Sequence, residues 1–340
     1  MSLFNQSCKR VSRSIHLATL VLALAASPAA LAGKPYKHYL VGDATDTVLP
    51  RPASPTLVLM GGGPDVDDAF KWMIRKAGGG NFVVLRATGT DAYNPYIYAM
   101  GGLRSVETII VPSRDAASDP FVVERVRRAE AVFIAGGDQS DYLRYWKDTP
   151  LEAALQDSAN RHIPLGGTSA GLAVLGQFIY SGENQSVTSG EALLDPYNKN
   201  VTLDRDFLSL SSMSRVITDS HLDTRDRMGR LVSFLGRIVK DGWAGTARGI
   251  GVDVETALLV EGSQAQRVGL GDVYFLQTVG LPQVCAPKTP LTYENVGVQR
   301  LSGAGSFDLA NWAGYGSTTN YTISAVKGVL QSKQPGGGVY

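Results

Sequence analysis

Between residues 56 and 168 the sequence alternates short apolar runs with amphipathic segments, and this alternation constrains the fold most. The runs at 56–60 (TLVLM), 81–88 and 131–134 (AVFI) are short and strongly apolar, which is typical of buried strands. The segment at 65–77 repeats apolar residues at helical spacing. Strands that alternate with helices predict an α/β fold with a doubly wound, mainly parallel sheet.

Beyond residue 169 the pattern is less regular but still readable. A strand is predicted at 214–221 (SRVITDSH) and a long amphipathic helix at 224–242. The segments 249–262 and 265–278 look like paired strands that close the sheet. Past residue 285 the composition shifts to Gly, Ser, Thr, Asn and Tyr, which predicts a small C-terminal β extension and a flexible tail over 286–340.

The first 32 residues have the features of a secretory signal peptide. Basic residues precede an apolar run at 17–26, and Ala30-Leu31-Ala32 resembles a cleavage site. The run is about half of the roughly 20 residues that a membrane span needs. We therefore expect cleavage after Ala32 and a secreted or periplasmic protein. The predicted parts are a signal peptide at 1–32, an α/β domain at 33–285 and the extension at 286–340.

Overall charge and cysteine content exclude several classes of function. Lys and Arg number 32 against 31 Asp and Glu, so no net field favours nucleic acid or an anionic membrane. Cleavage would leave Cys285 as the only cysteine, and no internal disulfide could then form. Cys285 lies between prolines without a nearby histidine, which favours a structural role over a nucleophilic one.

The sequence GTSAG at 167–171 joins a predicted strand to a predicted helix. A G-x-S-x-G turn in that context is a nucleophile elbow, in which the serine is strained and its hydroxyl exposed. The amides that follow Ser169, beginning with Ala170, could stabilise an oxyanion at the start of the helix. The alternative is a Gly/Ser connection that arises by chance.

A serine nucleophile needs a base, and the chain has only four histidines. His16 would leave with the signal peptide, and His38 lies near the predicted N-terminus. His162 begins the strand that Ser169 ends, so the two should be about 20 Å apart at about 3.3 Å per residue. His221 ends another strand at the same edge of the sheet and is the candidate base, the alternative being a core or capping histidine.

Residues 219–230 (DSHLDTRDRMGR) carry the densest charge pattern of the chain. Arginines beside a base could pair with substrate carboxylates, and aspartates could bind a guanidinium. A solvated helix start with surface ion pairs is the alternative reading.

Two other glycine-rich turns also follow predicted strands. Residues 61–63 (GGG) lack the spaced third glycine of a dinucleotide site, and the chain has neither a phosphate-binding loop nor a metal-ligand spacing, so we expect no cofactor. Residues 136–139 (GGDQ) could supply an oxyanion amide from Gly137 and a polar side chain, Gln139, that face Ser169.

Three motifs together resemble one known family. The sequences AGGDQSDYL, GGTSAG and DSHLDTRDRMGRL are similar to those of cyanophycinases, serine peptidases of family S51 in the dipeptidase E clan. RATGTDAYNPYI and the signal peptide resemble the secreted bacterial members. The resemblance covers roughly residues 56 to 280 and implies a flavodoxin-like or class I glutamine amidotransferase-like core, a homodimer, and cleavage of cyanophycin, a polyaspartate with arginine on each β-carboxyl, into β-Asp-Arg dipeptides.

The resemblance also implies roles for individual residues. Within the clan the acid of the triad lies between serine and histidine in chain order, which leaves Glu183 and Glu191, and we favour Glu191. Some cyanophycinases carry an acidic pair after the long helix, whereas here Val254 separates Asp253 from Glu255. The implied set is Ser169, His221 and Glu191 for catalysis, Gln139, Asp219, Arg225, Arg227 and Arg230 for substrate binding, and Gly137 and Ala170 for the oxyanion.

Two other functions remain open on the sequence alone. A peptidase of the same clan could act on soluble aspartyl or isoaspartyl dipeptides. A signal peptide before an α/β fold is also compatible with a non-catalytic periplasmic binding protein, although such proteins usually have two similar lobes.

Overall fold

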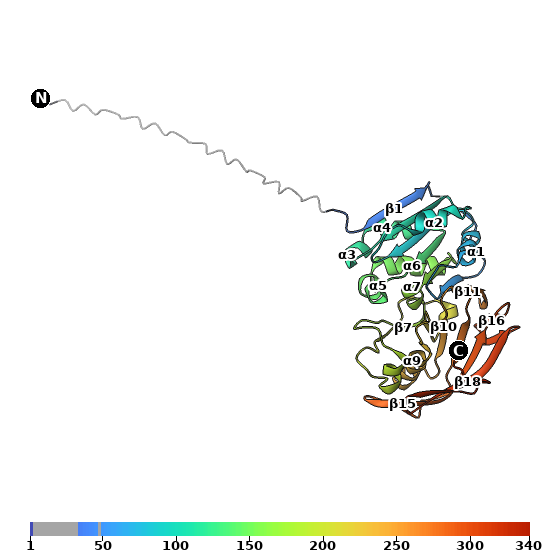
Figure 1. Cartoon of the computed structure of the whole chain (residues 1–340). Helices are drawn as coiled ribbons and strands as arrows, with labels where there is room; N and C mark the ends of the chain where they lie inside the picture. The colour runs from blue at the N-terminus through green and yellow to red at the C-terminus, as the bar shows by residue number, and fades with distance from the viewer. Residues whose placement is uncertain (3–32, 47–48) are drawn as a thin grey trace. The chain divides into compact units, whose positions relative to one another are not determined.

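A ten-stranded mixed sheet with a parallel centre forms the first half of the structure (Figure 1). The computed structural model describes residues 1–2, 33–46 and 49–340, so the predicted signal peptide lies outside the described residues. Pairing is parallel from β4 through β3, β5 and β6 to β2, and antiparallel elsewhere. The strand order is β1 (Lys37–Gly42), β4 (Ser105–Ile110), β3 (Asn81–Arg86), β5 (Ala131–Ile134), β6 (Leu165–Thr168), β2 (Thr56–Met60), β11 (Thr256–Glu261), β12 (Gln264–Gly269), β16 (Ser306–Asp308) and β17 (Ala313–Tyr315).

Helices cover both faces of this sheet, which explains why its central strands are apolar throughout. Phe82 and Val84 of β3 pack with α1 (Asp67–Ala77), whereas Val83 of the same strand packs with α4 (Pro120–Arg127) and α6 (Pro150–Asn160). Alternate residues of one strand thus serve two separate hydrophobic clusters.

A second, nine-stranded mixed sheet contains the remaining strands. Its parallel pairings join β7, β9 and β10, and the other strands are antiparallel. The buried face of α9 (Met228–Lys240) packs on this sheet in one cluster with Tyr293 and Ile323. The strand order is β19 (Val329–Ser332), β18 (Thr318–Val326), β15 (Thr289–Leu301), β13 (Val273–Gln277), β10 (Arg248–Val252), β9 (Val216–Asp219), β7 (Phe178–Tyr180) and β8 (Leu203–Arg205), with β14 (Val284–Ala286) paired to β15.

The remaining helices are short and lie mostly in the connections. None of the helices in the described ranges has the length and apolar character that a membrane crossing requires. These short elements are α2 (Tyr93–Ala99), α3 (Arg114–Ala117), α5 (Gln139–Trp146), α7 (Ala170–Ala173), α8 (Ser189–Leu194) and the 3-10 helix η1 (Ser211–Met213).

The α/β class and the extra C-terminal strands are confirmed, but two element predictions need correction. The segments 249–262 and 265–278 each divide into two strands that belong to different sheets. The chain turns between β10 and β11, where Glu255 has a φ of 52°, and again between β12 and β13, after Gly269 with a φ of 100°. The long helix begins at Met228 and not at residue 224, since Asp226 with a φ of 46° interrupts the helical backbone.

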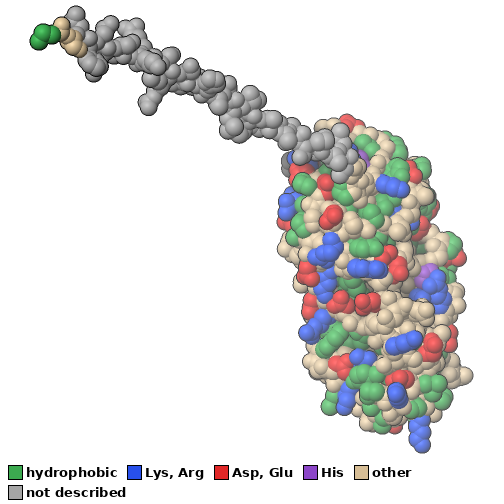
Figure 2. Space-filling view, turned by 90° about the vertical axis from the view of Figure 1, so that its left-hand side faces the viewer, with side chains coloured by type: hydrophobic (Ala, Val, Ile, Leu, Met, Phe, Trp, Pro, Cys, Tyr) green, Lys and Arg blue, Asp and Glu red, His purple; other side chains and the backbone are tan. Residues whose placement is uncertain are grey.

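The C-terminal strands belong to both sheets. β15 and β18 extend the second sheet, whereas β16 and β17 extend the first. Phe275 of β13 stacks on Phe307 of β16 with ring centroids 3.5 Å apart, and both side chains are fully buried. Residues beyond 286 therefore contribute to the core. The face shown in Figure 2 mixes basic and acidic side chains, in keeping with a net charge of +1.

Candidate active site

Ser169 occupies a strained turn between β6 and α7. Its φ of 53° and ψ of −112° are unusual for a residue other than glycine. A Cβ at Gly167 would lie 2.4 Å from the carbonyl carbon of Gly171, and one at Gly171 would lie 2.0 Å from the carbonyl oxygen of Ile134. Both positions therefore require glycine, and the tight packing holds the serine at the end of the strand.

His221 lies against Ser169 although it comes from the second sheet. Its Nε2 is 2.9 Å from Ser169 Oγ, and its main-chain N–H donates to the carbonyl of Gly61 at 2.8 Å. Gly61 directly follows β2 of the first sheet, so the hydrogen bond between His221 and Gly61 connects the two sheets at the site. The arrangement suits transfer of the serine proton to a neutral imidazole.

Gly62 is a site residue that the motifs in the sequence do not identify. A Cβ there would lie 2.4 Å from His221 Nε2 and 3.1 Å from the Cβ of Ser169, so only glycine leaves room for the pair. The sequence signal that could have identified Gly62 is the run of three glycines after β2. This run lacks the pattern of a nucleotide-binding loop, but a close approach of side chains also requires glycine.

A polar pocket of about 220 Å³ opens beside Ser169. It brings together every predicted site residue except Glu191 and His221, the second of which contacts Ser169 without lining the pocket. The pocket also includes polar side chains that the sequence does not single out, notably Asp138, Tyr180 and Ser186. The predicted residues that line it are Gly137, Gln139, Ser169, Ala170, Asp219, Arg225, Arg227 and Arg230.

Asp219 and Arg230 form a buried ion pair at one wall of this pocket. Arg230 donates from Nε to Asp219 Oδ2 at 2.7 Å and from Nη2 to Oδ1 at 2.5 Å, and each residue is only 3% exposed. The guanidinium also lies 4.9 Å from the ring centroid of Tyr180. Asp219 and Arg230, both predicted to bind substrate, thus bind each other. We interpret the pair as a rigid wall of the pocket.

Arg225 and Arg227 differ in how free their guanidinium groups are. Arg227 is half-buried and donates to the carbonyl of Ser220 at 2.8 Å. Arg225 is exposed, and within the described part of the chain it makes no side-chain ion pair. Arg225 is therefore the pocket's most available cation for a substrate carboxylate.

Burial and these arginines both favour the neutral form of His221. Burial, together with the positive charges of Arg225 and Arg227, lowers the pKa of His221 to about 4, while Asp219 acts in the opposite direction. The imidazole is consequently neutral near pH 7, the form that can accept a proton from serine.

Glu191 is not brought to His221. Its carboxylate accepts from the main-chain N–H of Thr188 at 2.9 Å and from the Thr188 hydroxyl at 2.8 Å, forming a capping box at the start of α8. Glu183 lines a different cavity, next to Asn184. Among the residues that the structure describes, no carboxylate forms a hydrogen bond with the His221 ring.

Asp253 directly follows β10 and is buried, and its carboxylate forms no hydrogen bond with the His221 ring. Its Oδ2 accepts from the N–H of Asp272 at 2.9 Å, whereas its Oδ1 has no partner among the described residues. Burial raises the pKa of Asp253 to about 7. Neighbouring Val254 lies against Gly63, where a Cβ would come within 3.1 Å of the valine Cβ.

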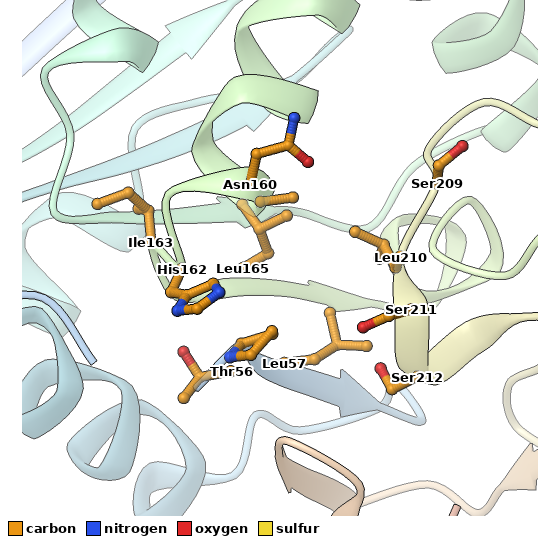
Figure 3. A pocket seen from close by; sticks show the side chains of 12 residues that line it. Thr56, Leu57, Asn160, His162, Ile163, Leu165, Ser209, Leu210, Ser211 and Ser212 are labelled. Carbon is orange, nitrogen blue, oxygen red and sulfur yellow. The ribbon is translucent and has the colours of Figure 1, made fainter. Parts of the chain in front are cut away.

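A second cavity, of about 260 Å³, lies at the opposite ends of β2 and β6 (Figure 3). Its lining includes Leu57, Leu165 and Leu210, together with His162 and Thr56. His162 therefore lies at the far end of the strand that Ser169 terminates. The cavity is larger than the pocket at Ser169, but its lining has no nucleophile–base pair.

Comparisons with known proteins relate this chain to one family of peptidases. The model of peptidase family S51 matches residues 102–268. Proteins named cyanophycinase from Nostoc sp. and Trichormus variabilis are each 29% identical over 220 residues, which is 63% of this chain and 68% of theirs. A peptidase structure from an acI-B1 Actinobacterium covers 75% of this chain and 97% of its own, with a TM-score of 0.50 and 18% identity, a likeness of fold.

The segment that matches the family contains both Ser169 and His221. Together with the similarity to the named relatives, this match supports a cyanophycinase-like peptidase of family S51.

Proposed function

We propose that this peptidase hydrolyses the polyaspartate backbone of cyanophycin to β-Asp-Arg dipeptides, through an acyl-enzyme on Ser169. The observation that carries the proposal is the 2.9 Å contact between Ser169 Oγ and His221 Nε2, beside a pocket that contains three arginines. The names of the relatives supply the substrate.

The mechanism begins with attack of Ser169 Oγ on a backbone carbonyl while His221 Nε2 takes the hydroxyl proton. The amides of Ala170 and Gly137 are the proposed donors to the oxyanion of the tetrahedral intermediate. Its collapse breaks the C–N bond, and His221 gives the proton to the leaving amine. Water then attacks the acyl-enzyme, again through His221, which releases the acyl part of the substrate as a carboxylic acid and restores the serine hydroxyl.

Charge complementarity accounts for the proposed substrate. The exposed guanidinium of Arg225 suits a free carboxylate at the end of the polymer. Asp138 is exposed in the same pocket, and its negative charge suits a guanidinium group of the substrate. A polymer that is too large to import also fits a secreted or periplasmic enzyme, which the sequence of the first 32 residues predicts.

The experiment compares the chain from residue 33 with its Ser169→Ala variant on insoluble cyanophycin. We expect β-Asp-Arg release by the first and at least about a thousand-fold less by the second, as loss of a nucleophile gives. Reaction of Ser169 with a fluorophosphonate probe reports the nucleophile without any substrate.

Two results would overturn the assignment. Cleavage of isoaspartyl dipeptides without release from cyanophycin would favour the dipeptidase alternative. Absence of both hydrolysis and probe labelling in a folded chain would favour a binding protein.

A further inference from the structure

The hydroxyl of Tyr340 contacts the loop that carries the pocket arginines. It donates to Asp226 Oδ1 at 2.8 Å and accepts from the main-chain N–H of Met228 at 3.1 Å. These two contacts fall on either side of Arg227, and Arg225 directly precedes Asp226. One hydroxyl thus binds the loop and the first residue of α9 together.

The start of α9 lacks a cap of its own. The residue before the helix, Arg227, makes no side-chain capping hydrogen bond, so the first N–H of the helix needs an acceptor from elsewhere. Tyr340 supplies that acceptor. Asp226, with a φ of 46°, holds an unfavourable backbone conformation, and its bond to Tyr340 helps to keep it there.

Tyr340 is itself held in place by the second sheet. Its ring meets that of Tyr274 edge-on with centroids 6.0 Å apart, and its carbonyl accepts from the Gln334 side chain at 2.9 Å. The preceding carbonyl, of Val339, accepts from the hydroxyl of Tyr321 at 2.9 Å. The hydroxyl therefore belongs to an anchored segment.

We propose that Tyr340 is a positioning residue for catalysis, whose hydroxyl fixes the 221–228 loop so that Arg225 and Arg227 face the substrate pocket. It lies outside the segment 102–268 that matches the peptidase family. The proposal rests on the proposed function for its effect on turnover, but the effect on His221 can be measured without substrate. The residues beyond 286 then contribute to the active site as well as to the core.

The test is Tyr340→Phe, which keeps the ring and removes only the hydroxyl. The matched control is Tyr197→Phe, because the Tyr197 hydroxyl binds Asp241 Oδ1 at 2.5 Å just beyond the opposite end of α9. We expect Tyr340→Phe to raise KM for cyanophycin about three- to ten-fold with a smaller change in kcat, the usual effect of one lost hydrogen bond. Tyr197→Phe should leave both values unchanged.

The second readout is the titration of His221, followed by NMR of the imidazole and assigned with His38→Gln and His162→Gln variants. Burial lowers the pKa of His221, Arg225, Arg227 and Arg230 lower it further, and Asp219 raises it. Arg230 is held by Asp219, Ser186 and Val187, none of which contacts Tyr340 through a hydrogen bond, so a loosened loop removes mainly the effect of Arg225 and Arg227. We expect Tyr340→Phe to raise the pKa of His221 by about half a unit or more.

A Tyr340→Phe protein that is folded and matches Tyr197→Phe in both KM and the His221 titration would overturn the proposal. A lower Tm with both readouts unchanged would also overturn it, because the hydroxyl would then contribute to stability alone. If the wild-type chain does not cleave cyanophycin, the proposed function fails, yet the His221 titration still decides whether Tyr340 positions the loop.

Discussion

His221 combines two properties that a general base needs. It contacts the serine hydroxyl at 2.9 Å, and its pKa is lowered to about 4 by burial and by the charges of Arg225 and Arg227. Burial and the pocket arginines together keep the imidazole uncharged far into the acid range, so the arginines have this effect in addition to the carboxylate binding proposed for them.

Replacing Arg225 with Gln should move the acid limb of the pH–rate profile to higher pH. Loss of a positive charge raises the pKa of His221 toward its ordinary value of 6.5, so the protonated, inactive form appears at a higher pH. We expect a shift of about half a unit or more in the limb of kcat/KM, with KM increased at every pH.

The control for that profile is Arg128→Gln, which removes an exposed arginine just after α4. It should leave the limb where it is. A limb that stays unchanged in Arg225→Gln, or moves to lower pH, would show that Arg225 does not act on His221.

The sequence could predict Ser169 and His221 as candidates because each has a positional signature. Ser169 lies in a G-x-S-x-G turn, and His221 is the histidine left after elimination. The acid could not be predicted in this way, since a carboxylate needs no local motif to reach a histidine. Thr188 followed by Glu191 has the spacing of a capping box, and the structure shows that local use of the glutamate.

At the level of elements, the turn from β6 into α7 is the least tolerant of substitution. Gly171→Ala would place a Cβ 2.0 Å from the main-chain oxygen of Ile134, and neither strand nor helix can move away without displacing Ser169. We expect a loss of about 3 kcal/mol or more in the free energy of unfolding, at or above the usual cost of overpacking. Turnover should fall at least about a hundred-fold from the misplaced serine.

Gly190→Ala is the matched control for that change. Gly190 lies in α8, where a Cβ added to its backbone would meet no atom within 4 Å, so alanine should be neutral or stabilise by up to about 1 kcal/mol. Urea unfolding and kcat measured on both variants test the prediction, and equal stabilities would contradict it.

Elements with strong periodicity could be predicted, and their interruptions could not. The buried face of α9, with Leu231 and Phe234, follows from its spacing. Two of the places where prediction failed involve residues other than glycine at positive φ, Asp226 before α9 and Glu255 between β10 and β11. Tertiary contacts, such as the hydrogen bond from Tyr340 to Asp226, stabilise these backbone conformations. The local sequence contains no pattern that predicts such contacts.

Over the whole chain, the C-terminal strands make the two sheets depend on each other. Phe307 is fully buried and stacks on Phe275 of the other sheet. Phe307→Ala should lower the free energy of unfolding by about 3–5 kcal/mol, as expected for a large core side chain. Phe307→Leu, which keeps most of the volume, should cost about 1–2 kcal/mol.

Urea unfolding followed by circular dichroism measures both variants. A cost for Phe307→Ala no larger than that for Phe307→Leu would mean that the C-terminal strands are only loosely attached. The sequence composition predicts a β-rich extension here, but the division of its strands between two sheets depends on long-range pairing that composition does not encode.

The hydrogen bond from His221 to Gly61 has a consequence for how such a protein can be divided. Nucleophile and base follow strands of different sheets, and their meeting depends on the junction at the end of β2. Neither sheet can therefore be exchanged, duplicated or expressed alone and still supply a working catalytic residue. A chimera assembled from two relatives would inherit both side chains and still be inactive unless its junction came from one parent, so recombination should spare the whole stretch from β2 to β10.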